Sequence, residues 1–187
     1  MRDPIHQRAY LILALTVTTI ACRPAGPARS EGSEAATNKN WSLGPGGLGR
    51  LQFGMTQSES ARRLDLPGEA APTVGGCRYW VPAGLPVGAR LMVEDGRVVR
   101  ADVDSGTIKT TEGAGIGSSE AQVGQLYKGM VSQPHKYRSA EGWHDLIYRP
   151  ERAADSGSRL VFETDGQTVR SFRAGVEPAV EYVEGCG

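Results

Sequence analysis

Apolar and polar residues alternate along the chain in two stretches, and each stretch is interrupted by Asp-Gly. In the first stretch, residues 89–94 and 97–103 flank Asp95-Gly96. In the second, the apolar positions of residues 159–173 surround Asp165-Gly166. A period of two is typical of half-buried strands, and Asp-Gly between such runs favours a two-residue type I′ turn. The pattern therefore predicts two antiparallel hairpins.

A two-residue turn fixes which residues lie opposite each other across a hairpin. The expected pairs are Met92–Val99 and Leu91–Arg100 in the first hairpin, and Phe162–Val169 and Val161–Arg170 in the second. In each hairpin one arginine, Arg100 or Arg170, then lies on the face opposite the buried apolar pair. We expect both arginines to be solvated on an open sheet face or to belong to a binding patch.

A helix start precedes each hairpin. Gly54-Met55-Thr56-Gln57-Ser58-Glu59 and Gly117-Ser118-Ser119-Glu120-Ala121-Gln122 share the pattern Gly-x-[Ser/Thr]-x-x-[Glu/Gln]. In such a capping box the hydroxyl accepts from the backbone three residues on, and the Glu or Gln side chain accepts from the N-cap N–H. We expect helices from Thr56 to about Leu66 and from Ser119 to about Lys128.

One supersecondary unit therefore occurs twice in the predicted fold. Further strands are expected at residues 51–53, 77–81, 143–148 and 180–184. The fold class is α+β, with two tandem helix-plus-antiparallel-meander units. The first unit covers residues 41–104 and the second covers residues 105–187.

Residues 1–21 are predicted to be an export signal that is cleaved. Positive charges precede an apolar run from Tyr10 to Ile20, which is too short to span a bilayer. The following Thr19-Ile20-Ala21-Cys22 resembles the lipobox of bacterial lipoproteins, in which the cysteine becomes the acylated N-terminus. Cleavage after Ala21 by an ordinary signal peptidase is the alternative. Residues 22–40 are rich in Pro, Gly, Ser and Ala, which predicts a disordered tether.

The chain has three cysteines. With Cys22 assigned to the lipid, Cys77 and Cys186 remain. In an exported protein two remaining cysteines most simply form a disulfide, which would connect the C-terminus to the first unit. Two buried thiols are the alternative.

Charge and motifs exclude several functions. Lys plus Arg and Asp plus Glu each number 21, so no basic field would attract nucleic acid. His135 and His144 lie in no nucleophile, zinc or phosphate-loop motif, although Asp145 could orient His144 as a general base. The glycine-rich segment 44–49 lacks the Lys-[Ser/Thr] of a phosphate loop. We therefore predict no catalytic residue, no metal site and no cofactor.

Aromatic residues on the strand before each hairpin are the candidate binding residues. Together with the two arginines, the candidate surface comprises Tyr79, Trp80, Arg100, Trp143, Tyr148 and Arg170. Tyrosine and tryptophan on an exposed sheet are natural anchors for a protein or a sugar. The alternative is that alternate members fill the core.

The capped helices, the tight-turned meanders and the lipobox together resemble known families. Gly54-Met55-Thr56-Gln57-Ser58-Glu59 is similar to the helix start of the SmpA/OmlA lipoproteins, which are accessory factors of β-barrel assembly. The doubled unit resembles the beta-lactamase inhibitor proteins, in which the sheet grips an enzyme, although Ser118 replaces the usual apolar residue. The resemblance implies a non-enzymatic lipoprotein that binds an unknown envelope protein. Arg23 after the cysteine points by analogy to the outer membrane, facing the periplasm. Enzyme inhibition and carbohydrate binding are the alternative functions.

Overall fold

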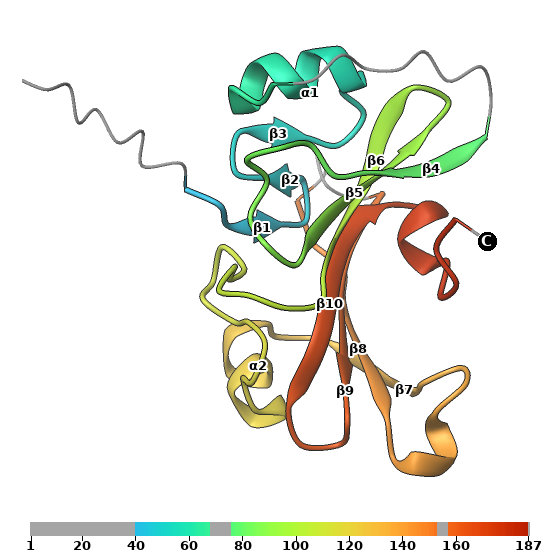
Figure 1. The fold of residues 1–187 in the computed structure, drawn as a ribbon. Helices are drawn as coiled ribbons and strands as arrows, with labels where there is room; N and C mark the ends of the chain where they lie inside the picture. Colours follow the sequence, from blue (N-terminus) through green and yellow to red (C-terminus); the bar gives the residue numbers. More distant parts are fainter. Residues whose placement is uncertain (1–39, 68–75, 153–156, 187) are drawn as a thin grey trace, which may run out of the picture. The chain divides into compact units, whose positions relative to one another are not determined.

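A seven-stranded antiparallel sheet forms the centre of the fold, in the order β4-β5-β6-β10-β9-β8-β7 (Figure 1). The computed structural model describes residues 40–67, 76–152 and 157–186, so the predicted signal and nearly all of the predicted tether lie outside the described residues. The strands are β4 (Cys77–Trp80), β5 (Ala89–Glu94), β6 (Arg97–Val103), β7 (Val131–Pro134), β8 (His144–Tyr148), β9 (Ser158–Thr164) and β10 (Val169–Val176).

A second, three-stranded sheet precedes the large one in the chain. It consists of β1 (Leu43–Gly44), β2 (Gly47–Leu48) and β3 (Leu51–Gln52). Glycine is required at position 47, because a Cβ there would lie 1.8 Å from the carbonyl oxygen of Leu51. The three leucines of this sheet are fully or almost fully buried in the main core. The small sheet is therefore part of the same hydrophobic core as the large one.

Both predicted capping boxes are confirmed. In α1 (Gln57–Leu64) the Glu59 backbone N–H donates to Thr56 Oγ1 at 3.2 Å, and the Thr56 N–H donates to the Glu59 carboxylate at 2.8 Å. In α2 (Glu120–Leu126) Ser119 and Gln122 exchange the same two bonds, at 3.2 and 2.8 Å. Both helices are shorter than predicted. The first ends where Asp65 takes the left-handed conformation, with φ of 49°.

The predicted α+β fold of two tandem helix-plus-meander units was wrong. The described residues are mostly β, with ten strands in two sheets and α-helices of only eight and seven residues. The strands that follow the two helices do not form separate meanders, because β6 pairs with β10 from Arg100↔Gly175 to Val103↔Phe172. This pairing joins all seven strands into one sheet over one main core.

The first predicted hairpin forms, but its register differs beyond the turn. Glu94↔Arg97 and Val93↔Val98 pair as a two-residue turn requires. A β-bulge then leaves Val99 as an extra residue, so that Met92 lies opposite Arg100 and not opposite Val99. Because one inserted residue reverses the alternation of side chains, the bulge decides which face of the sheet Arg100 occupies.

The second hairpin has a longer turn than predicted. Thr164 pairs with Val169, because the Asp165 carboxylate accepts the backbone N–H groups of Gln167 and Thr168 at 3.0 and 2.8 Å and so closes a four-residue turn. A register shift between Val169 and Ser171 follows. The observed pairs are therefore Phe162↔Phe172 and Val161↔Arg173 instead of the predicted ones.

The two faces of the large sheet have different neighbours. One face packs against α1, α2 and the small sheet, and carries the main core around Phe162 and Phe172 (Figure 1). Against the other face lies the end of the chain, where Val180 joins a small cluster with Ile147 and Val161. This C-terminal segment (residues 177–186) contains the 3₁₀ helix η3 (Ala179–Glu181), so the strand predicted at 180–184 was wrong. A further 3₁₀ helix, η1 (Ser139–Glu141), lies between β7 and β8.

Candidate functional site

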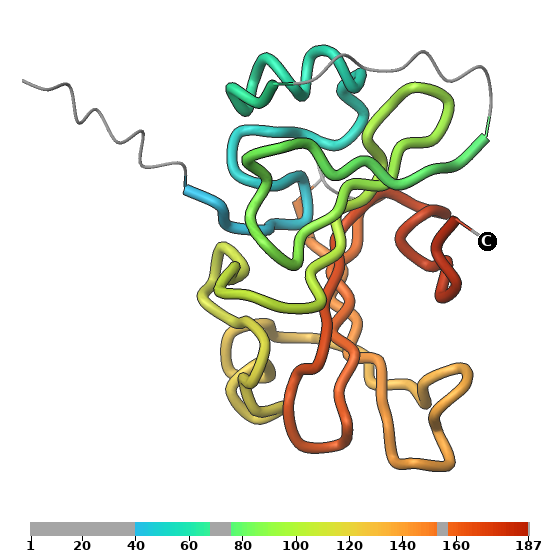
Figure 2. Tube along the Cα trace, viewed as in Figure 1, coloured from blue at the N-terminus to red at the C-terminus, as the bar shows by residue number. Residues whose placement is uncertain are grey.

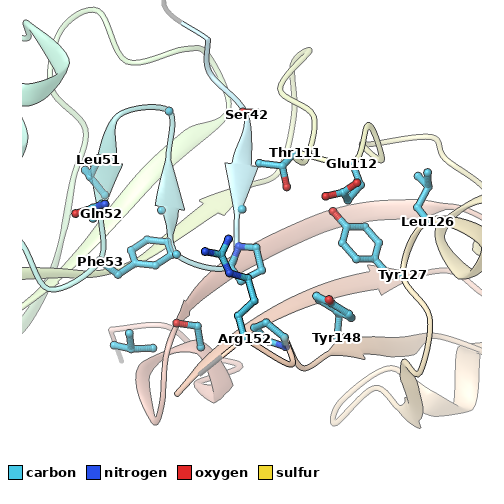
Figure 3. A pocket seen from close by; sticks show the side chains of 18 residues that line it. Ser42, Leu51, Gln52, Phe53, Thr111, Glu112, Leu126, Tyr127, Tyr148 and Arg152 are labelled. Atoms are coloured by element: carbon cyan, nitrogen blue, oxygen red, sulfur yellow. The ribbon is translucent and has the colours of Figure 1, made fainter. Parts of the chain in front are cut away.

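A cleft of about 800 Å³ opens beside the small sheet (Figure 3). We call it the aromatic cleft, because Phe53 lies on one side of it and Tyr127 and Tyr148 lie on the other, as Figure 3 shows. Arg152 and Glu112 add one positive and one negative side chain to its wall. The volume is in the range typical of small-molecule and peptide sites.

The aromatic wall is fixed to the core. The ring of Tyr127 lies 4.9 Å from that of Tyr148 and 5.5 Å from that of Phe162, measured between centroids. Tyr127 is buried, and burial raises the pKa of its hydroxyl group. Among the described residues this hydroxyl has no hydrogen-bond partner of ordinary geometry. This wall therefore packs against the core through Tyr127 and carries a buried polar atom.

The opposite wall is built from the turn Gly44-Pro45-Gly46-Gly47. Gly44 and Gly47 pair with each other across β1 and β2, and the Phe53 N–H donates to the Gly46 carbonyl at 3.0 Å, so this wall is a closed turn of the small sheet. Sequence reasoning had rejected this segment as a phosphate loop and assigned it no other role. No sequence motif marked Tyr127, Phe53 or Arg152 as a site residue.

The opposite face of the sheet carries a set of buried charges, which we call the polar face. Arg100 is 3% exposed, and its Nε donates to the two carboxylate oxygens of Asp102 at 2.9 and 3.1 Å. Its Nη1 donates to the backbone carbonyls of Ala179 and Tyr182 at 3.0 and 2.6 Å. The prediction that Arg100 is solvated was therefore wrong, because this arginine holds the C-terminal segment against the sheet.

Arg173 makes the equivalent contacts on the neighbouring strand. It forms an ion pair with Glu163, and its Nε donates to the carbonyl of Val180 at 2.7 Å. Burial alone would raise the pKa of Glu163, but the hydrogen bond from Ser171 and the Arg173 guanidinium lower it below its usual value. A pocket of about 330 Å³ remains between the polar face and residues 183–185.

His135, Asp145 and Glu163 lie next to this network, with potential ligand atoms within 4.8 Å of one another. His135 Nδ1 accepts the backbone N–H groups of Tyr137 and Arg138, each at 3.2 Å. A neutral ring in this setting carries its proton on Nε2, so neither nitrogen offers a metal a free lone pair. The Glu163 carboxylate is already paired with the Arg173 guanidinium. Burial raises the pKa of Asp145 and so disfavours the carboxylate form that a metal would bind. This cluster therefore does not suit a metal ion.

The six residues predicted as one binding surface occupy different environments. Tyr79 and Arg100 line the polar face, and Tyr148 lines the aromatic cleft. Trp80 is 8% exposed and belongs to the core. Trp143 packs under the guanidinium of Arg138, 3.4 Å from the ring centre. Arg170 is exposed and pairs with Asp165.

The predicted disulfide between Cys77 and Cys186 is confirmed, with 5.3 Å between the two Cα atoms. It ties the C-terminal segment to β4, an edge strand of the large sheet. The disulfide and the two buried arginines together fix this segment over the polar face. Cys22 lies outside the described residues. No helix in the described ranges is long and apolar enough to cross a membrane.

The sequence matches no known protein family and no curated protein. Comparison of structures finds an extracellular protein containing a SCP domain from Bacillus anthracis strain Ames, with a TM-score of 0.41. The two chains are 12% identical, and the match covers 84% of this chain and 50% of that one. The chain thus spans half the length of that protein. A likeness this low carries no argument about fold or function.

Proposed function

We propose that this protein is an exported, non-enzymatic lipoprotein that binds a segment of an envelope protein in the aromatic cleft. The observation that carries the proposal is the cleft itself, which combines aromatic side chains packed on the core with a glycine-rich turn. Tyrosine rings in a pocket are frequent anchors at protein interfaces. Arg152 and Glu112, one positive and one negative, can select charged side chains of the bound segment.

The composition of the cleft favours binding over catalysis. Among the described residues, its lining holds no histidine, cysteine or lysine, and its only carboxylate is that of Glu112. An occupant would therefore be held and released without a covalent step.

The proposed location is the cell envelope, with the lipid on Cys22 in the outer membrane and the domain facing the periplasm. The short apolar leader and the Thr19-Ile20-Ala21-Cys22 segment support export and lipidation. The disulfide supports an oxidising compartment. If Cys22→Ala protein stays in the membrane fraction, the anchor is contradicted.

Photocrosslinking in growing cells tests the binding function. A photoreactive phenylalanine replaces Gln52, an exposed residue of the cleft, and in a control it replaces Ser58, an exposed residue of α1 outside the cleft. We expect a single adduct from position 52 and none from position 58. Tyr148→Ala should weaken the adduct about tenfold, as loss of ~1.4 kcal/mol of binding would.

The crosslinking result also separates this proposal from its alternatives. An adduct with an enzyme whose activity falls on binding would support the inhibitor function. Protection of the cleft by an oligosaccharide, without any protein adduct, would support a carbohydrate-binding module. Equal adducts from positions 52 and 58, or an adduct unaffected by Tyr148→Ala, would contradict the use of the cleft.

A further inference from the structure

The loop between β4 and β5 is unusually apolar for a surface segment. Residues 81–88 read VPAGLPVG, with no charged or hydrogen-bonding side chain. Val87 is 84% exposed and Val81 is 64% exposed, the two highest values among the large exposed hydrophobic residues described. Pro82 is buried and Leu85 packs against the main core, so the most exposed large apolar side chains lie at the two ends of the loop. An apolar side chain as exposed as that of Val87 is available to another apolar phase or a partner.

The Val87 end of this loop lies beside the point where the described chain begins. Pro86 shares a shallow hollow with Asn40, Trp41 and Lys109. Figure 2 shows the loop between β4 and β5 passing next to the first described residues. The described chain therefore begins on the same side of the domain as the Val87 end of the loop.

The intervening chain is short enough to hold this side near a membrane. About 18 residues separate Cys22 from Asn40. Their composition predicts a flexible tether, and a tether of that length would have a root-mean-square span of roughly 25 Å and a maximum of about 60 Å. Tethering at such distances gives even a weak contact a high effective concentration.

We propose that the Val87 end of this loop rests on the bilayer that carries the Cys22 lipid, and this inference rests on the lipid anchor of the proposed function. Val87 and Pro86 would enter the head-group region. Trp41 and Lys109, at the base of the loop, are the residue types found at the membrane interface, because an indole prefers the head-group level and an ammonium group pairs with lipid phosphates. With this side against the membrane, the domain would have a fixed orientation on the bilayer.

An environment-sensitive fluorophore tests this contact. NBD is attached to Val87→Cys and, as a control, to Val131→Cys, because Val131 is a half-exposed valine on β7 at the far edge of the sheet. The native Cys77–Cys186 bond does not react with the label. The mature chain carries a hexahistidine tag in place of Cys22 and binds phosphatidylethanolamine–phosphatidylglycerol vesicles through nickel-chelating lipid. This arm reports the loop contact even if Cys22 proves not to be lipidated, which the membrane fraction of Cys22→Ala tests separately.

We expect the label at position 87 to shift to the blue and to be quenched by a nitroxide on the lipid chain near the head group. The label at position 131 should stay unquenched. Lys109→Glu should reduce quenching at position 87 severalfold, because it adds a charge that the lipid phosphates repel. Equal quenching at both positions, or none at position 87, would overturn the proposal. A concentration-dependent shift at position 87 without vesicles would also overturn it, because a second copy of the chain would then cover the loop.

Discussion

The buried Arg100 gives the sharpest test of how the polar face is stabilised. In Arg100→Met, a side chain of similar length loses its charge, and Asp102 is left as a buried carboxylate without its cation. Both side chains are nearly inaccessible, at 3% and 8% exposure. Removing one partner of such a pair costs about 3–5 kcal/mol. The carbonyls of Ala179 and Tyr182 lose their donor at the same time.

A second variant separates the two contributions. In Arg100→Met/Asp102→Leu no buried carboxylate remains, and replacing a buried ion pair by apolar residues is often close to neutral. Only the carbonyls of the C-terminal segment then lack donors, so we expect a loss of about 1–3 kcal/mol. Arg170→Met is the matched control, because this exposed ion pair should contribute less than about 1 kcal/mol.

Urea unfolding at neutral pH measures these differences as changes in the free energy of unfolding. Hydrogen exchange over residues 177–186 should also rise in Arg100→Met while the disulfide still holds Cys186. If Arg100→Met costs no more than Arg170→Met, or if exchange of the C-terminal segment is unchanged, the stabilising role assigned to Arg100 is wrong.

Three further predictions follow from local geometry. Replacing Cys77 and Cys186 by serine should lower the free energy of unfolding by about 4.7 kcal/mol, because the disulfide closes a loop of 109 residues. The urea unfolding curve of this variant should have a lower midpoint, and an unchanged midpoint would contradict the prediction. Thr56→Ala and Ser119→Ala should each lower the free energy of unfolding by about 1 kcal/mol in the same assay, because each removes an N-cap hydroxyl. A loss below roughly 0.3 kcal/mol, which is the size of an ordinary surface substitution, would contradict the stabilising role of the caps. The pKa of Asp165 is lowered to about 2, mainly by the hydrogen bond from the Thr168 backbone N–H and then by the Arg170 side chain. The stability that the Asp165 carboxylate contributes is therefore complete above its unfolded pKa near 3.9 and is lost as the pH falls through about 2. A carbon-detected NMR titration measures the pKa of Asp165 in the folded protein, and a value of about 3.9 would disprove the turn geometry.

Local features could be predicted from the sequence because their causes are local. The capping boxes need only residues three positions apart, as at Thr56 and Glu59, and the Asp95-Gly96 turn needs only two adjacent residues. The disulfide followed from counting cysteines under an assumption about compartment. These signals could not show how the elements assemble, because capped helices and hairpins are compatible with several sheet orders.

Register and burial depended on single residues that no periodic pattern marks. The bulge at Val99 and the longer turn after Asp165 each shifted the pairing, and the first placed Arg100 on the polar face. The pairing of β6 with β10 joins residues far apart in the chain, so no local pattern encodes it. For the same reason the aromatic cleft could not be assembled from the sequence, since Phe53, Tyr127 and Tyr148 come from three separate segments.

The central pairing of β6 with β10 has a consequence for how the chain acquires its structure. Arg100 cannot pair with Gly175 until the chain has been made as far as β10, so until then the β6 edge of the first hairpin is unpaired. An unpaired edge of this kind can capture another strand. We therefore expect a chain truncated before residue 169 to associate with itself. During synthesis the chain should need a chaperone until β10 has been made.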